Sequence, residues 1–256
     1  MIKKRIIPVL LTLNNRLVKT KQFVKPLNVG NLLNSSKVYN NSDADELIVL
    51  NIDRQADKNI DVLILNIKQI TKCCFMPLAF GGGIRNLNDA DQLISNGADK
   101  VILNSICYKN YDLISEISKQ FGNQSVVISI DAKFDKERNI YNLYSNNGKK
   151  KENILLENHL KNIKESGAGE VFINSIDNDG MKVGYDLNLV NTVKHNSNLP
   201  IIACGGAGNF NHIKDLFLKT NISAAACGSL FNFGDNNPIR AKAFLQNYDI
   251  KFRSIK

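Results

Sequence analysis

Short runs of apolar, mostly β-branched residues alternate along the chain with longer segments in which apolar residues recur at helical spacing. Short apolar runs are typical of buried strands, and apolar residues at every third or fourth position are typical of amphipathic helices. The runs predict strands at Arg5–Leu11, Glu46–Asn51, Met76–Phe80, Lys100–Leu103, Val126–Asp131, Glu170–Asn174, Ile201–Cys204 and Ser223–Cys227. The periodic segments predict helices, for example at Asp61–Thr71, Leu87–Asn96, Tyr111–Phe121, Ile154–Ser166 and Ile213–Lys219.

This alternation predicts an α/β fold built from βαβ units, and eight such units close into a (β/α)8 TIM barrel. The length of 256 residues suits one such barrel, and 43% hydrophobic residues suffice for its core. The alternative is an open doubly wound sheet, which predicts a glycine-rich turn after the first strand. That strand leads instead into Thr12–Arg16, which contains no glycine. The polar stretch Ser145–Asn153 is expected to form a long loop or a hairpin.

The two halves of the chain resemble each other. Met76–Gly83 and Leu199–Ala207 each contain a proline, a short predicted strand and a glycine pair. A helix and a further strand follow in both halves, ending in Asn104-Ser105 and in Gly228-Ser229. The pattern predicts one domain over residues 1–256 with a twofold internal repeat, in half-barrels of about 1–124 and 125–256.

Charge and composition narrow the range of partners. The net charge of +9 predicts either a lysine-rich solvated surface or attraction of anionic ligands. No basic stripe is interleaved with aromatic residues, no apolar run has transmembrane length, and no secretory signal precedes the first strand, so we expect a cytoplasmic protein that binds neither nucleic acid nor membrane. The five cysteines lack zinc or redox spacing; we expect reduced thiols, no metal and no cofactor.

Glycine turns follow the third and the seventh predicted strands. Glycine lets backbone N–H groups approach an anion closely, and phosphate sites in barrels often lie at such turns. The alternative is that these glycines only make tight turns, but two copies at matching positions favour phosphate. The predicted phosphate-binding residues are Gly82, Gly83, Asn104 and Ser105 in the first half-site and Gly205, Gly206, Gly228 and Ser229 in the second.

Acidic residues also cluster at the predicted strand ends. Asp131 ends the fifth strand, where a carboxylate points into the ligand space and general acid/base catalysis is expected; a salt bridge to Lys133 is the alternative. Asp179 and Gly180 follow the sixth strand, with Gly180 expected to donate its N–H to an anion. Asp179 either holds a ligand hydroxyl or orients a turn. Asp53 is a weaker candidate for substrate binding.

The chain resembles the cyclase subunit of imidazole glycerol phosphate synthase from Arg5 to about Phe233. The motifs that carry the resemblance are Arg5-Ile-Ile-Pro8, Phe80-Gly-Gly-Gly-Ile84, Gly97-Ala-Asp-Lys-Val101, Asp131-Ala-Lys133, Gly169-Glu170, Ser175-Ile-Asp-x-Asp-Gly180 and Ile202-Ala-Cys-Gly-Gly-Ala-Gly208. The resemblance implies a barrel that receives ammonia from a separate glutaminase subunit and closes an imidazole ring on a bis-phosphorylated substrate. The phosphates then fall on the two half-sites.

The resemblance also implies two catalytic aspartates. Asp131 matches the second, but the first falls at Leu11, and leucine neither accepts nor donates a proton. An acidic residue of the family's second strand appears here as Asn51, with Asp53 close by. Ring closure by two carboxylates is therefore not expected to proceed unchanged.

A charged ring at the N-terminal face is retained. By resemblance, Arg5, Glu46, Lys100 and Glu170 form a gate that admits ammonia from the glutaminase, which docks there as a heterodimer. Ion pairing that merely closes the barrel floor is the alternative. Asp99 lies beside this face and is expected to help to dock the partner.

One branch of this family combines a retained gate with a lost carboxylate. The chain resembles it in Ile7-Pro-x-Leu-Leu11, Leu17-Val-Lys-Thr20, Cys74-Phe-Met-Pro77 and Gly228-Ser-Leu-Phe231. There, ammonia from a glutaminase helps to convert a sugar's acetamido group to an acetamidino group for surface polysaccharides, together with a further sugar amidotransferase. This glutamine-dependent synthase subunit is the leading hypothesis. The alternatives are a genuine histidine-pathway cyclase and a non-catalytic phosphate-binding scaffold that activates the glutaminase.

Overall fold

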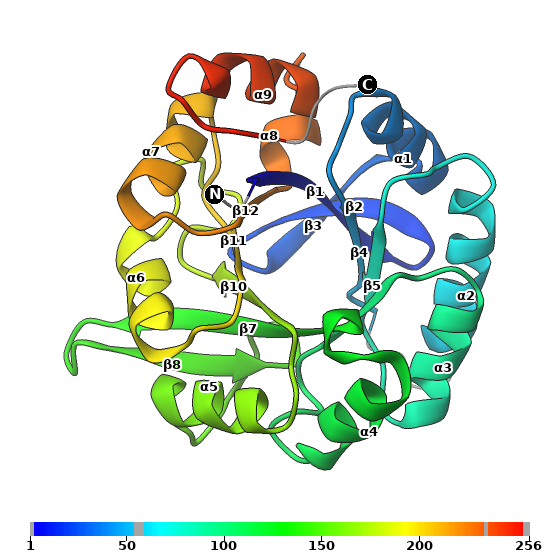
Figure 1. Cartoon of the computed structure of the whole chain (residues 1–256), viewed down its shortest axis with the longest axis vertical. Helices are drawn as coiled ribbons and strands as arrows, with labels where there is room; N and C mark the ends of the chain where they lie inside the picture. Colours follow the sequence, from blue (N-terminus) through cyan, green and yellow to red (C-terminus); the bar gives the residue numbers. More distant parts are fainter. Residues whose placement is uncertain (1–2, 54–58, 233–234, 253–256) are drawn as a thin grey trace.

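Parallel strands close into a barrel in the computed structural model, which describes residues 3–53, 59–232 and 235–252. Around the barrel the strands are β1 (Arg5–Leu13), β4 (Leu47–Asn51), β5 (Leu78–Gly81), β6 (Lys100–Leu103), β7 (Val126–Asp135), β10 (Glu170–Ser175), β11 (Ile201–Cys204) and β12 (Ala224–Cys227). β12 pairs with β1 in parallel and closes the circle (Figure 1). The predicted (β/α)8 barrel is confirmed, and the open sheet is ruled out.

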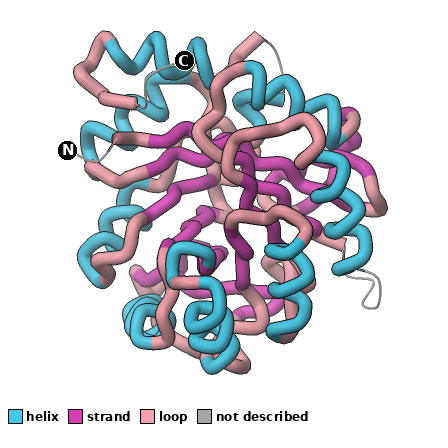
Figure 2. The backbone as a smooth tube through the Cα atoms, turned by 45° about the vertical axis from the view of Figure 1, so that its right-hand side comes forward, coloured by secondary structure: helices cyan, strands magenta, loops and turns pink. Residues whose placement is uncertain are grey.

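Helices surround the strands on the outside (Figure 2). They are α1 (Leu32–Asn41), α2 (Asn59–Ile70), α3 (Leu87–Ser95), α4 (Asp112–Phe121), α5 (Leu156–Glu165), α6 (Leu187–Asn196), α7 (Phe210–Thr220), α8 (Ser229–Asn232) and α9 (Pro238–Gln246), with a short 3₁₀ turn at Asn123–Ser125. The five helices given as examples lie within three residues of their predicted bounds. The polar α1 has weak apolar periodicity, and it begins at an Asn31 side chain that accepts a hydrogen bond from the Asn34 N–H.

Two antiparallel hairpins extend beyond the C-terminal end of the barrel. β1 continues to Leu13 because it pairs with β2 (Arg16–Lys21), which in turn pairs with β3 (Val24–Gly30). Asn14 and Asn15 both have positive φ, as a two-residue hairpin turn requires. Two asparagines therefore form a turn that the sequence analysis did not predict, because the segment contains no glycine. β7 likewise pairs with β8 (Ile140–Ser145), and β8 pairs with β9 (Lys150–Lys151), which confirms the hairpin option for Ser145–Asn153.

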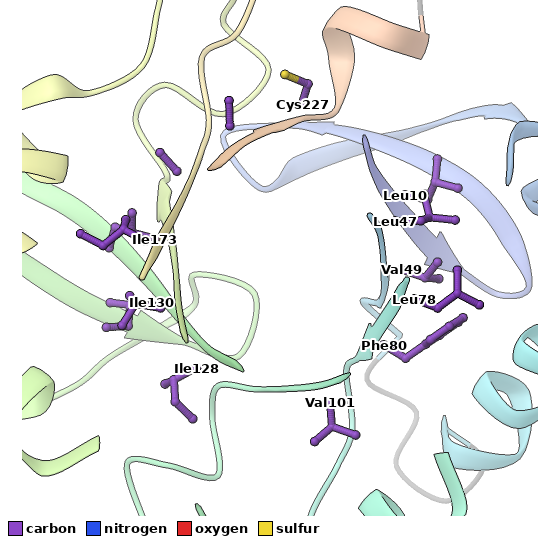
Figure 3. Packing of buried hydrophobic residues seen from close by; sticks show 14 of the residues in the cluster. Leu10, Leu47, Val49, Leu78, Phe80, Val101, Ile128, Ile130, Ile173 and Cys227 are labelled. Carbon is purple, nitrogen blue, oxygen red and sulfur yellow. The ribbon is translucent and has the colours of Figure 1, made fainter. Parts of the chain in front are cut away.

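The strands are buried on both faces. Leu10, Val49 and Phe80 point away from the barrel axis towards the helices (Figure 3). The opposite faces fill the barrel lumen with a second apolar cluster. That lumen cluster consists of Ile7, Val9, Ile48, Ala79, Ile102, Val127, Phe172, Ile202, Ala224 and Ala226. This two-sided burial explains why the strands appear as continuous apolar runs in the sequence.

The last helix is attached to the first strands by a buried ion pair. Lys242 on α9 is 1% exposed, and its Nζ lies 2.9 Å from Asp45 Oδ1 and 2.9 Å from Asp43 Oδ2. Asp45 Oδ2 also accepts a hydrogen bond from the Ile6 N–H at 2.7 Å. A single lysine therefore links α9 to the segment before β4 and, through Asp45, to β1.

All five cysteines are free thiols, as predicted. Within the described ranges, no helix combines the length and apolar character needed to cross a bilayer.

Candidate active site

A cavity of about 410 Å³ opens at the C-terminal ends of the barrel strands. Every predicted phosphate-binding residue lines it, as do Asp131, Asp179 and Leu11. Asp53 is not among its lining residues; its N–H instead donates to Asn51 Oδ1 at 3.0 Å just beyond β4. The structure therefore brings the predicted site together except for Asp53, whose role in substrate binding stays a prediction.

The first half-site lies where β5 turns towards α3. Gly82 has a φ of +97°, and a Cβ there would lie 1.9 Å from the carbonyl oxygen of Asn51. Only glycine therefore fits this close approach to the end of β4. Ser105 already accepts a hydrogen bond from the Asn146 N–H at the tip of the β8–β9 hairpin, at 3.2 Å.

The second half-site lies on the opposite side of the barrel, after β11. Gly206 has a φ of +101°, and a Cβ there would lie 1.9 Å from the carbonyl oxygen of Gly184. Gly184 donates its own N–H to the Gly206 carbonyl at 2.8 Å. The two loops that form this turn are thus bonded backbone to backbone, and the turn is preformed.

Lys19 is a site residue that sequence reasoning missed. It lies on β2, is 7% exposed, and its Nζ would lie 2.0 Å from a Cβ at Gly228 in the second half-site. Burial lowers the pKa of its ammonium group, while the charge of Asp179 opposes that shift. The motif Leu17-Val-Lys-Thr20 contains this lysine and could have marked it as a site residue. The motif alone does not show that the β2–β3 hairpin places Lys19 in the cavity.

Asp179 joins the loop after β10 to the β2–β3 hairpin. Its Oδ2 accepts a hydrogen bond from Thr20 Oγ1 at 2.9 Å, and its carbonyl accepts one from the Gln22 N–H at 2.9 Å. Burial raises the pKa of this carboxyl group, and Lys19 opposes the shift. These contacts favour the orienting role among the two alternatives for Asp179. Gly180 lies beside it, where a Cβ would be 2.5 Å from the Thr20 carbonyl.

Asp131 lies within β7 rather than at its end, because the strand continues to Asp135 in the hairpin. It is 7% exposed, whereas Lys133 is exposed to solvent. Its Oδ2 accepts a hydrogen bond from Asn104 Nδ2 at 2.8 Å, which connects the predicted general acid/base to the first half-site. Leu11 is on β1, which stands opposite β7 in the circle of strands (Figure 1).

At the N-terminal mouth, the four predicted gate residues form a ring of ion pairs. Arg5 Nη1 lies 2.8 Å from Glu46, Lys100 Nζ lies 2.9 Å from Glu46 and 3.0 Å from Glu170, and Arg5 Nη2 also bonds Glu170. Burial raises the pKa of Glu46, although the charges of Lys100 and Arg5 oppose this shift. Burial alone would lower the pKa of Arg5, but the charges and hydrogen bonds of Glu170 and Glu46 outweigh burial, and the net shift of the Arg5 pKa is upward. The four residues predicted to form the gate therefore lie in contact with one another. Its role as an ammonia gate stays a prediction.

Asp99, the residue expected to help to dock a partner, is exposed beside this ring. Its Oδ2 accepts a hydrogen bond from the Leu78 N–H at 2.8 Å, so its carboxylate also caps the start of β5.

The family model for histidine biosynthesis protein matches residues 5–237, which include the ring, the lumen and both half-sites. The chain belongs to the histidine biosynthesis protein family. Among its relatives, the imidazole glycerol phosphate synthase subunit HisF of Staphylococcus epidermidis is 40% identical over 232 residues, 91% of this chain and 92% of the relative. The same subunit from Staphylococcus saprophyticus is 38% identical over 253 residues, 99% of this chain and all of the relative.

Proposed function

We propose that this member of the histidine biosynthesis protein family is the synthase subunit of a glutamine amidotransferase. It takes ammonia from a partner glutaminase at the N-terminal mouth of the barrel and uses it on a phosphorylated substrate in the cavity at the other mouth. The observation that carries the proposal is that one barrel joins an ion-pair ring to a cavity with two preformed glycine turns.

The lumen between the two mouths supports this route. It is filled by an apolar cluster that includes Ile7, Ile102 and Phe172. Neutral ammonia crosses such an environment at far lower cost than ammonium, because an unpaired charge is strongly disfavoured there. The ring of Arg5, Glu46, Lys100 and Glu170 then opens to admit ammonia when the glutaminase docks.

In the cavity, the half-sites bind phosphate through the backbone N–H groups of their glycine turns. The buried ammonium of Lys19 adds positive charge to the second half-site. Asp131 transfers a proton to or from the reacting group, and Asn104 positions its carboxylate.

Two substrates are candidates for this machinery. The names of both relatives favour formation of an imidazole ring in histidine biosynthesis, with Asp131 as the catalytic carboxylate. The apolar Leu11 opposite Asp131 favours the second candidate, in which ammonia contributes to the amidination of an acetamido sugar for surface polysaccharide, together with a sugar amidotransferase. A scaffold that only activates the glutaminase is the remaining alternative.

The deciding experiment supplies the bis-phosphorylated imidazole precursor and ammonium salt to the purified chain. Rapid ring closure supports the cyclase and contradicts the other two functions. If ring closure is absent, sugar amidination is assayed with the glutaminase, and an amidination rate that is unchanged in Asp131→Asn supports the scaffold.

Phosphate binding is tested separately. Crystals soaked in inorganic phosphate should show one anion beside Gly82 and one beside Gly206. Two empty glycine turns would contradict the proposed phosphorylated substrate.

A further inference from the structure

Two neighbouring thiols lie at the N-terminal mouth of the barrel, in the loop that leads into β5. The Sγ atoms of Cys73 and Cys74 are 3.9 Å apart, and both residues are free cysteines. Cys73 is partly exposed, whereas Cys74 is only 5% exposed. One thiol can therefore be reached from solvent, and the other is buried beside it. Neither takes part in the proposed function.

The backbone around the pair can change its conformation. Residues 71–77 connect α2 to β5 and belong to no helix or strand. The Ile70 carbonyl accepts hydrogen bonds from the N–H groups of Cys73 at 3.0 Å and of Cys74 at 2.9 Å. Adjacent Cα atoms are about 3.8 Å apart, less than the roughly 4.4 to 6.8 Å of most disulfides. Joining the two sulfur atoms therefore requires rotation of the peptide between them.

The two thiols differ in reactivity. Burial raises the pKa of the Cys74 thiol to about 12, and its hydrogen bond with Cys73 adds to this shift. Cys74 is therefore protonated at neutral pH, and a protonated thiol is a poor nucleophile. Cys73 is the thiol that an oxidant in solution meets first, and Cys74 is held close enough to react with its product.

We propose that Cys73 and Cys74 form a modification site, at which a hydroperoxide converts the two thiols to a reversible disulfide. The Cys73 thiolate attacks one peroxide oxygen, the O–O bond breaks, and a sulfenic acid forms while the other oxygen takes up a proton and leaves. The Cys74 sulfur then attacks the sulfenic sulfur. The S–S bond forms, and the sulfenic oxygen leaves as water with the Cys74 proton. With hydrogen peroxide the products are the disulfide and two molecules of water.

The disulfide alters the face on which the ion-pair ring lies. The next residue, Phe75, is 87% exposed, and its N–H donates to Asn40 Oδ1 on α1 at 2.8 Å. At the end of the same loop, the Pro77 carbonyl accepts a hydrogen bond at 2.9 Å from the N–H of Leu47, the neighbour of Glu46 in the ring. Rotation of the peptide between the cysteines displaces Phe75, because the two are directly bonded.

This displacement links the modification to the supply of ammonia. Exposed aromatic side chains are enriched in protein–protein interfaces, so Phe75 is suited to contact a protein that docks at this mouth. The oxidised chain then binds the glutaminase more weakly than the reduced chain. This consequence rests on the proposed function, whereas formation of the disulfide does not.

Oxidation of the full chain with hydrogen peroxide tests the site. Remaining thiols are alkylated with iodoacetamide, and the peptide that contains both cysteines is analysed by mass spectrometry. This peptide should be unalkylated and lighter by two hydrogen atoms, and dithiothreitol should restore both thiols. A peptide alkylated at both cysteines, or one that carries a stable sulfinic acid at Cys73, would overturn the proposal.

Serine variants separate the roles of the two thiols. In Cys74→Ser, oxidation should stop at the sulfenic acid of Cys73, which dimedone traps. In Cys73→Ser, the remaining buried thiol should be oxidised at least about tenfold more slowly. Cys107→Ser changes a buried thiol outside the pair, and this matched control should form the disulfide as the unaltered chain does. Equal oxidation rates in the first two variants would overturn the assigned roles.

Binding of the purified glutaminase tests the consequence. The oxidised chain and reduced Phe75→Ala should each bind it about tenfold more weakly than the reduced, unaltered chain. Equal binding before and after formation of the disulfide would overturn the link to ammonia supply. A disulfide that forms in a chain to which the glutaminase never binds would support the modification site and contradict the proposed function.

Discussion

The two mouths of the barrel are built from the same strands, but one holds a ring of ion pairs and the other holds an open cavity. At the N-terminal mouth, Lys100 pairs with Glu46 and Glu170, and Arg5 pairs with the same two glutamates. At the C-terminal mouth, a cavity remains and the Oδ1 of Asn174 has no partner among the described residues. Four charged side chains close one end of the barrel, although Glu46 Oε1 has no hydrogen-bond partner among the described residues, while the other end holds an open cavity.

The strongest test of this contrast is Asp131→Asn. The amide keeps the size of the side chain but loses the carboxylate. Turnover in whichever of the two assays shows activity, ring closure or sugar amidination, should therefore fall about a thousandfold, as for removal of a general acid/base. Asp135→Asn on the same strand, beyond the cavity, is the matched control and should keep near-normal turnover. Equal rates in the two variants would remove Asp131 from the mechanism.

At the opposite mouth, Lys100→Met should lower the free energy of unfolding by about 3 kcal/mol, because it leaves two buried glutamates with one cation fewer. Lys150→Met breaks a lysine–glutamate pair of the same 2.9 Å length, but the Lys150 side chain is 56% exposed against 18% for Lys100. That variant should lose less than about 1 kcal/mol. Urea unfolding measures both, and similar losses would show that burial does not strengthen the ring.

The glycine turns of the cavity mouth predict a slightly smaller effect. Gly82→Ala should destabilise the fold by about 2 to 3 kcal/mol, because its Cβ clashes with the Asn51 carbonyl at a positive φ. Gly30→Ala also has a positive φ, but a Cβ there meets nothing within 4 Å. We expect it to cost about 1 kcal/mol. Phosphate affinity should fall in Gly82→Ala and not in Gly30→Ala.

The smallest predicted effect concerns a buried histidine near the loop that carries Asn104. His159 stacks on Tyr108 with ring centroids 4.5 Å apart, and its Nδ1 lies 2.8 Å from the Tyr111 hydroxyl. Burial lowers its pKa from 6.5 to about 4, although Glu152 opposes the shift. The unfolded chain therefore binds the extra proton first. Stability is full above pH 6.5 and falls as the pH drops towards 4, by about 2 kcal/mol at pH 5.

The comparison variants for this pH effect are His159→Phe and His195→Phe. His159→Phe keeps a ring beside Tyr108 but removes the titrating group, so its unfolding free energy should change less between pH 7 and pH 5. His195 is exposed on α6, and its variant should follow the unaltered chain. A pH dependence that is the same in all three proteins would exclude His159 as the cause.

The sequence predicted the barrel well because its strands are buried on both faces and appear as uninterrupted apolar runs. Gly82 and Gly206 were found because close backbone approach demands glycine at those positions. Lys19 was missed because its place against Gly228 depends on how the β2–β3 hairpin folds over the mouth. Asp53 was a candidate by its closeness to β4 in sequence; it is not among the residues that line the cavity, and its role in substrate binding stays a prediction.

The buried contact between Lys242 and Asp45 has a consequence for how the molecule is made. On the ribosome, β1 and Asp45 emerge about 180 residues before β12 and Lys242 do. Until then, the edge of β1 that pairs with β12 in the finished barrel has no partner strand, and the Asp45 carboxylate lacks the ammonium group of Lys242. Closure of the cylinder therefore has to follow the synthesis of β12, and the Asp45 carboxylate that holds β1 gains its cation only once α9 has been made.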